Sequence, residues 1–260
     1  MLIFGISEYI CTFINDVQLR PNCDVIISKC EAEDFLKSSK PVLETMSARY
    51  YELSLTSSKT TGYTEEVILS DFFINLLNED IQPYAILGGI NTERTQKSNV
   101  ETTSYSQDES YTAEQTPISG QSQIQNMGLA VFNGDKLVGE LTGIDCICHL
   151  IVTNQLDTAT ISIPSPFEDE QTIALEITLT KPPSKSVKLI NNSPFIETNA
   201  YITARVMSLS NGMDYTKEEN LSKLEEYANN YLESSISNYL YKTSKEFNSD
   251  IVRFWKRIEK

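Results

Sequence analysis

The chain has 260 residues, which is enough for two compact units, and its 40% hydrophobic and 22% charged content is typical of folded rather than disordered proteins. Thirty-six acidic residues against 21 basic ones give a net charge of −15, which excludes nucleic acid and anionic lipid headgroups as expected electrostatic partners. No apolar run reaches the roughly 20 residues of a membrane-spanning helix, so we expect a soluble chain.

The first third of the chain predicts one strand and three helices. β-Branched residues after Pro21 indicate the strand, and apolar residues at three- and four-residue steps indicate the helices. Ser70 is a candidate cap for the third helix. The inward face of that helix is expected to carry Phe72, Phe73, Leu76 and Leu77. The expected ranges are 22–28 for the strand and 29–37, 47–56 and 70–77 for the helices.

The middle of the chain combines an apolar strand at 83–90 with a polar segment at 91–125. This segment has too few apolar residues to offset the entropy lost on ordering, so we expect a long loop or a mobile insertion. Two β-rich runs then flank Asn133-Gly134, a pair that readily supplies the positive φ angles of a tight turn. The sequence therefore predicts a β-hairpin directly after the insertion.

The run at 143–153 is apolar on both faces. Its part Cys146-Ile-Cys-His-Leu-Ile-Val is predicted as a strand with Cys146 and Cys148 on one face and His149 on the other, although periodicity leaves a buried helix open. We interpret the two cysteines as small buried hydrophobic side chains rather than metal ligands. The five cysteines are odd in number and lack zinc-like spacing, so no complete disulfide framework is predicted.

The C-terminal part predicts an antiparallel sheet and a long helix. Leu175, Ile177 and Leu179 alternate with more polar neighbours, which is typical of a half-buried strand. From Lys217 to about Ser249, apolar residues recur at helical steps, so we expect this helix to pack on the sheet, with a coiled-coil partner as the alternative. The strands are expected at 158–163, 172–182, 186–190 and 195–209. The apolar face of the helix consists of Leu221, Leu224, Ala228, Tyr231, Leu232, Ile236, Tyr239 and Leu240.

Catalytic chemistry finds little support in the sequence. His149 is the only histidine, so a Ser/His or Cys/His arrangement would rest on one side chain in an apolar segment. Gly88-Gly89 lacks the Lys-Ser/Thr ending of a phosphate-binding loop. Acidic pairs such as Glu65-Glu66 are typical of solvated faces. We therefore predict no enzyme activity, no catalytic residue, no cofactor and no metal site.

Three stretches share their order and character with one known family. The first, Asp16-Val-Gln-Leu-Arg-Pro-Asn-Cys-Asp-Val-Ile-Ile-Ser-Lys-Cys-Glu-Ala-Glu-Asp, looks like an arginine-containing strand and helix. The second, Gly128-Leu-Ala-Val-Phe-Asn-Gly-Asp-Lys-Leu-Val-Gly-Glu-Leu-Thr-Gly-Ile-Asp, is similar to a hairpin in which an acidic residue follows the second Gly. The third, Tyr239-Leu-Tyr-Lys-Thr-Ser-Lys-Glu-Phe-Asn-Ser-Asp-Ile, closely resembles the end of that family's last long helix. Through these stretches the chain resembles the Ger(x)C family of spore germination lipoproteins, the C subunit of the nutrient germinant receptor.

The resemblance implies an α+β fold of consecutive mixed α/β domains, with the C-terminal antiparallel sheet packed against the long helix. We expect a remnant of the N-terminal domain at 1–44, a middle domain at 45–156 with a mobile insertion at about 91–125, and a C-terminal α+β domain at 157–260. The family usually carries Glu in place of Asp145, and Asp250 matches its helix-end motif. These two residues are the candidate partner-contact or structural positions.

The resemblance also implies a function. Family members are lipid-anchored subunits on the outer face of the spore inner membrane, beside membrane-embedded subunits of the same receptor complex, and they are not catalysts. The family's signal peptide and lipidated cysteine are not found here, so we expect membrane contact through a lipid anchor absent from this chain. Two hypotheses remain, an assembly or scaffold subunit and a receptor domain that binds a small nutrient. Because no concentrated set of polar and aromatic residues marks a pocket, the sequence favours the scaffold.

Overall fold

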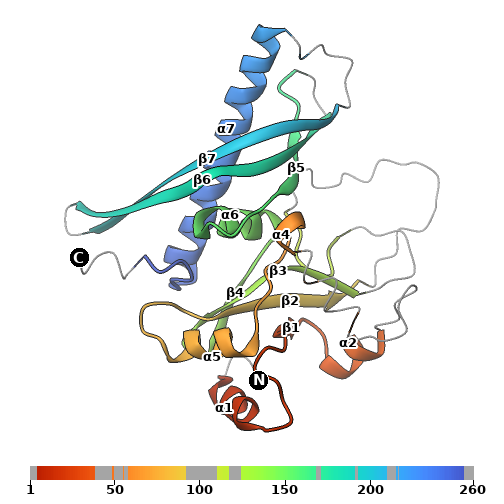
Figure 1. Ribbon diagram of the computed structural model, residues 1–260, viewed down its shortest axis with the longest axis vertical. Helices are drawn as coiled ribbons and strands as arrows, with labels where there is room; N and C mark the ends of the chain where they lie inside the picture. Colours follow the sequence, from red (N-terminus) through yellow and green to blue (C-terminus); the bar gives the residue numbers. More distant parts are fainter. Residues whose placement is uncertain are drawn as a thin grey trace.

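The computed structural model describes residues 5–38, 49, 55, 58–91, 110–116, 124–167, 171–190, 193–209, 215 and 217–254. Helices and strands are mixed along the chain, and the strands form one four-stranded and one three-stranded sheet (Figure 1). The second sheet is antiparallel and is accompanied by one long helix. The predicted α+β class, with a C-terminal antiparallel sheet and long helix, is therefore confirmed.

The first sheet is mixed and forms the centre of the N-terminal half. In spatial order its strands are β1 (Ile26–Ser28), β2 (Tyr84–Ile90), β3 (Ile124–Asn133) and β4 (Lys136–Leu141). β1 runs parallel to β2, and the other two pairs are antiparallel. Because β1 pairs with β2, the segment predicted as an N-terminal remnant shares a sheet with the predicted middle domain.

Helices α1 (Ser7–Asn15), α2 (Ala32–Ser38) and α5 (Leu69–Leu77) lie around this sheet, whereas the short α4 (Ser58–Thr61) lies by the second sheet (Figure 1). Phe72 of α5 is fully buried and meets the edge of the Phe132 ring at a centroid distance of 5.4 Å. Ser70, predicted as the cap, lies inside the helix, which begins at Leu69. The N-cap residue is Ile68, and no side-chain hydrogen bond caps the helix. Leu77, predicted inward, is exposed. The helix predicted at 47–56 lies largely outside the described residues.

The turn between β3 and β4 is tight, as predicted, but it is shifted by one residue. Asn133 pairs with Lys136 as the last residue of β3, so Gly134 and Asp135 form the turn. Gly134 has φ +59°, whereas Asn133 stays outside the left-handed region. The Ser7 hydroxyl donates to the Asp135 carboxylate at 2.9 Å, and so the turn also fixes the start of α1.

The run at 143–153 is the helix α6 (Gly143–Thr153), so the strand predicted from Cys146 is wrong. Nearly all of its residues are buried, and a helix buried on every side has no amphipathic period to reveal it. A capping box starts the helix: the Thr142 hydroxyl accepts the Asp145 N–H, and the Asp145 carboxylate accepts the Thr142 N–H. Asn154, at φ +64°, ends it.

The second sheet consists of β5 (Ala159–Pro164), β6 (Thr172–Ile190) and β7 (Ser193–Leu209). β6 is one long strand that spans both strands predicted at 172–182 and 186–190. The register of β6 with β7 shifts at Pro182 and Pro183. Lys181 pairs with Tyr201, whereas Ser184 pairs with Asn199. The predicted alternation is confirmed, because Leu175 and Ile177 are buried between less buried neighbours.

The long helix α7 (Glu218–Tyr241) continues into the π-helical turn η1 (Lys242–Glu246). Its buried residues are Leu224, Ala228, Leu232 and Tyr239, which belong to the predicted apolar face. They share one hydrophobic cluster with the inner residues of β5 and β6, and α7 also contacts α6 (Figure 1). Leu221, predicted on the same face, is exposed. The apolar face of α7 therefore packs within the chain, as predicted.

Part of the polar segment at 91–125 is ordered. Ala113 is fully buried, and its N–H donates to the carbonyl oxygen of Met127 at 3.2 Å. The carbonyl oxygen of Tyr111 accepts the Gly143 N–H at 2.9 Å, next to the start of α6. Residues 110–116 thus pack on the fold, and β3 already begins at Ile124. The insertion predicted as mobile otherwise lies outside the described residues.

After η1 the chain returns to the first sheet, where it forms a closing segment at 247–254. The Ser249 hydroxyl donates to the carbonyl oxygen of Phe132 at 2.6 Å. The carbonyl oxygen of Asp250 accepts the N–H of Gln82, which lies just before β2, at 2.8 Å. The last apolar side chains of this segment, Ile251, Val252 and Phe254, are buried. The closing segment therefore packs against the first sheet, although it is distant from that sheet in the sequence.

Candidate functional site

Four polar side chains form a buried polar cluster where the loop before α5, β2, α6 and α7 meet. His149 Nδ1 lies 2.6 Å from the Tyr239 hydroxyl, and the Tyr84 hydroxyl donates to Glu65 Oε1 at 2.9 Å. His149 Nε2 lies 3.0 Å from Glu65 Oε2, close enough for an ion pair but poorly aligned for a hydrogen bond. The Tyr84 ring stands edge-on to His149 at 4.9 Å. The cluster therefore joins the first sheet to α6 and α7.

Burial controls the charge of the two phenols in this cluster. Desolvation, reinforced by the nearby Glu65 carboxylate, raises the pKa of Tyr84 well above its usual value. Desolvation also raises the pKa of Tyr239, and Tyr84 adds to this effect. Both hydroxyls therefore stay protonated at physiological pH. Glu65 itself is buried, so the expectation of a solvated acidic pair holds only for Glu66, which is exposed.

The cluster is enclosed and cannot meet a substrate directly. The His149 side chain has no exposed surface and Glu65 is only 8% exposed. A general base must come within hydrogen-bond reach of the proton that it removes, and neither group can do so from this position. What the arrangement can do is hold four separate segments of the chain in one place.

Tyr239→Phe should destabilise the fold by about 1–3 kcal/mol, because it leaves the buried His149 Nδ1 without its partner. The free energy of unfolding from denaturant titration measures the effect. Tyr241→Phe is the matched control, since Tyr241 lies on the same helix with its side chain exposed and should change stability by less than about 0.5 kcal/mol. Equal effects of the two changes would show that the His149–Tyr239 contact contributes nothing.

The two cysteines of α6 are buried, as predicted. Cys146 and Cys148 are fully buried, and burial raises the pKa of each thiol. Protonated, enclosed thiols are poor nucleophiles and poor metal ligands. All five cysteines of the chain are free. Within the described residues, no group of three or more His, Cys, Asp or Glu side chains is placed to hold a metal ion.

The two acidic residues singled out from the sequence lie in different places. Asp145 is 7% exposed, and its Oδ2 accepts bonds from the Thr142 hydroxyl at 2.9 Å and from Lys242 Nζ at 2.5 Å. It thereby ties the first turn of α6 to the first residue of η1. Asp250 is half-buried in the closing segment, where its Oδ1 accepts the Val252 N–H at 2.9 Å. The Asp145 carboxylate thus joins two separate segments, whereas this contact of Asp250 is local to the closing segment.

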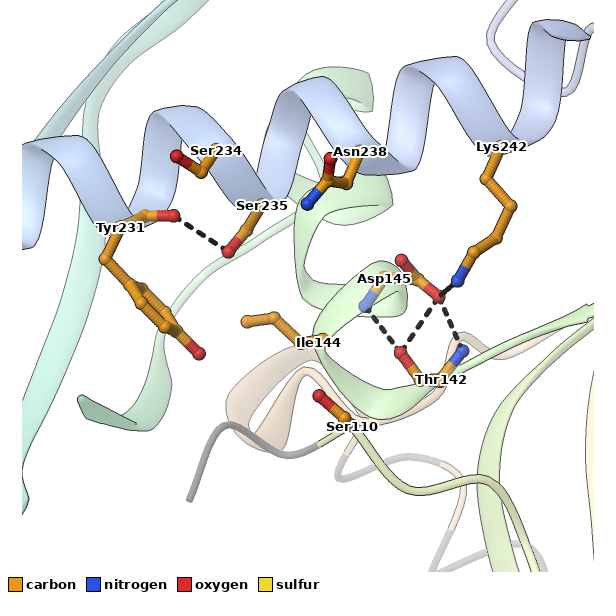
Figure 2. Close-up of a pocket in the computed structure, with 9 residues that line it drawn as sticks. All are labelled: Ser110, Thr142, Ile144, Asp145, Tyr231, Ser234, Ser235, Asn238 and Lys242. Carbon is orange, nitrogen blue, oxygen red and sulfur yellow. Dashed lines mark hydrogen bonds and ion pairs between the residues drawn. The ribbon is translucent and has the colours of Figure 1, made fainter. Parts of the chain in front are cut away.

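A pocket of about 320 Å³ opens beside the Asp145–Lys242 ion pair (Figure 2). Its walls come from the segment at 110–116, from Thr142 and the first turn of α6, and from one face of α7 and η1. The lining residues are Ser110, Thr142, Ile144, Asp145, Tyr231, Ser234, Ser235, Asn238 and Lys242. The sequence did not predict this pocket, because its residues come from three distant segments that carry no shared motif.

Two family models match the chain. The one described as "Spore germination protein N-terminal domain" matches residues 4–90, and the one described as "Spore germination B3/ GerAC like, C-terminal" matches residues 127–260. No curated protein matches the chain.

A solved structure is also similar. The crystal structure of the GerBC protein aligns over 98% of this chain with a TM-score of 0.56 and 14% sequence identity, which shows a shared fold. The alignment covers 64% of the GerBC chain, so this chain spans less than two thirds of the length of that protein. Among the described residues, no helix is both long and apolar enough to cross a membrane.

Proposed function

Because the chain belongs to the family of GerAC-like spore germination proteins, we propose that it is a non-enzymatic subunit of a spore germinant receptor complex. It acts as an assembly and scaffold component, with membrane-embedded subunits of the same complex as its partners. Its place is the outer face of the spore inner membrane, where a lipid anchor makes the membrane contact.

The observation that carries the scaffold role is the way in which the two sheets are joined. One hydrophobic cluster contains buried side chains of both sheets, of α6 and of α7. The buried polar cluster adds contacts across the same junction, because His149 lies 3.0 Å from the Glu65 carboxylate and edge-on to the Tyr84 ring. Contacts of this kind favour one fixed arrangement of the two halves. A fixed arrangement suits a subunit that presents surfaces to more than one partner.

The outer face of the β6-β7 ribbon is the surface that best fits a partner protein. Phe195 and Tyr201 are 51% and 42% exposed on this face, and the ammonium group of Lys181 lies over the Tyr201 ring at 3.5 Å. No strand among the described residues pairs with the outer edge of β7. Aromatic side chains are enriched in protein interfaces relative to the rest of the surface. We assign the contact with a receptor subunit to this face.

Spores in which the chain carries Phe195→Glu and Tyr201→Glu should lose co-purification of the membrane-embedded receptor subunits with the chain and should respond weakly to nutrients. The reason is that two carboxylates would have to be desolvated in the interface. Leu36→Glu, an equally drastic change at an exposed position on α2, is the control. If the double variant retains the receptor subunits as the control does, the ribbon is not the contact.

Hydrolase activity of the purified chain that is lost on His149→Ala would instead contradict the non-enzymatic role.

A further inference from the structure

The pocket between α6 and α7 is lined mainly by side chains that can donate or accept hydrogen bonds. Ser234 and Asn238 of α7 and Lys242, the first residue of η1, recur at four-residue steps, so they line the pocket from one side of the helix (Figure 2). Ser110 closes the opposite side. The volume of about 320 Å³ is at the lower end for small-molecule sites, which suits a ligand the size of a single sugar ring.

The ion pair at the edge of the pocket selects against charged ligands. Asp145 Oδ2 and Lys242 Nζ are only 2.5 Å apart, so a cation would approach the ammonium group and an anion would approach the carboxylate. The bonds of the Asp145 carboxylate with Thr142 and Lys242 all use Oδ2, which leaves Oδ1 outside these contacts. Lys242 uses one of its three N–H groups for the pair. A neutral molecule that both donates and accepts hydrogen bonds matches this arrangement.

The rest of the lining has the same mixed character. The Ser235 hydroxyl donates to the carbonyl oxygen of Tyr231 at 2.8 Å and can still accept a bond from a ligand. The Asn238 amide offers two donors and an acceptor. The half-buried Tyr231 ring and the Ile144 side chain add apolar surface on one side. Alternating hydroxyl groups and an apolar ring face are the features of a sugar or a cyclic polyol.

The helix that forms one wall changes geometry at the pocket. α7 ends at Tyr241 and η1 begins at Lys242, and the Phe247 N–H donates to the Lys242 carbonyl oxygen at 2.9 Å, a five-residue step. Single π-helical turns within α-helices occur frequently at functional sites. From this geometry together with the lining, we propose that the pocket binds a small, neutral, hydroxyl-rich molecule of the size of a monosaccharide or cyclic polyol.

The test is a titration of the isotopically labelled full chain with D-glucose and, separately, with myo-inositol, followed by amide NMR shifts. Saturable shifts are expected at Ser110, in the first turn of α6 and at residues 234–242. Ser234→Leu fills the pocket and should weaken binding by about tenfold or more. Ser237→Leu makes the same exchange at an exposed position of α7 outside the lining, and it should leave the affinity unchanged.

Two results would overturn the proposal. One is the absence of localised, saturable shifts with both polyols. The other is equal weakening, or no weakening, by Ser234→Leu and Ser237→Leu, which would place the ligand elsewhere. L-Alanine serves as a zwitterionic comparison: localised shifts with alanine and none with the polyols would reject the neutral ligand class. The scaffold proposal does not depend on these results, because it is tested on the β6-β7 ribbon.

Discussion

Gly128→Ala is expected to cost more than about 4 kcal/mol, a large part of the 5–15 kcal/mol that stabilises a typical domain. Gly128 in β3 has φ +83°, a left-handed conformation that costs other residues about 1–2 kcal/mol. A β-carbon there would also lie 1.9 Å from the carbonyl oxygen of Leu141, a backbone atom that cannot rotate away. β3 and β4 would have to separate beside the start of α6. Thermal unfolding followed by circular dichroism measures the loss.

The matched control is Gly134→Ala in the hairpin turn. Gly134 also has a positive φ, +59°, but a β-carbon at this position would meet no atom within 4 Å. Only the conformational cost of about 1–2 kcal/mol should then appear. The difference between the two variants isolates the clash with Leu141. If both variants melt at the same temperature, the fold relieves that clash without cost and the tight approach of β3 to β4 is not required.

Leu232→Ala should destabilise the fold by about 2–5 kcal/mol. Leu232 is 6% exposed and belongs to the cluster that α7 shares with β5 and β6, so its truncation leaves a cavity in the core. A clear drop in the denaturant midpoint at an unchanged slope would measure this loss. The alternative weighed from the sequence, a coiled-coil arm with an exposed apolar stripe, predicts an unchanged midpoint.

Leu221→Ala is the control for the same helix. Leu221 is 50% exposed, although its spacing placed it on the same apolar face as Leu232. The same truncation should therefore change stability by less than about 0.5 kcal/mol. A large effect at Leu221 would show that the first turns of α7 pack more tightly than their exposure indicates.

Local signals in the sequence predicted much of the fold. The hairpin followed from Gly134, the alternation in β6 from Leu175 and Ile177, and α7 from its helical spacing. α6 was misread because its apolar residues face protein on every side and so have no period. β6 was predicted as two strands, at 172–182 and 186–190, although it continues through Pro182 and Pro183. The register shifts that accommodate them depend on the partner β7, which local sequence does not reveal.

The candidate sites were less predictable than the elements that carry them. The sequence marked His149 and Asp145, but Tyr239 lies 90 positions from His149, and Lys242 lies 97 positions from Asp145. Glu65 was predicted to be one of a solvated pair. It is buried because it contacts residues of α6 and β2, which the sequence around it does not reveal. Side-chain pairs of this kind arise only when the topology is known. Local patterns alone could not find the buried polar cluster or the pocket.

The closing segment has a consequence for how the protein is made. The residues of β2 and β3 are synthesised early, but Gln82 and Phe132 acquire their partners Asp250 and Ser249 only when residues 249 and 250 emerge from the ribosome. Contacts over such sequence separations slow folding, because loop closure must precede the stabilising contact. The nascent chain is therefore expected to stay open and exposed to proteases until its last part is synthesised.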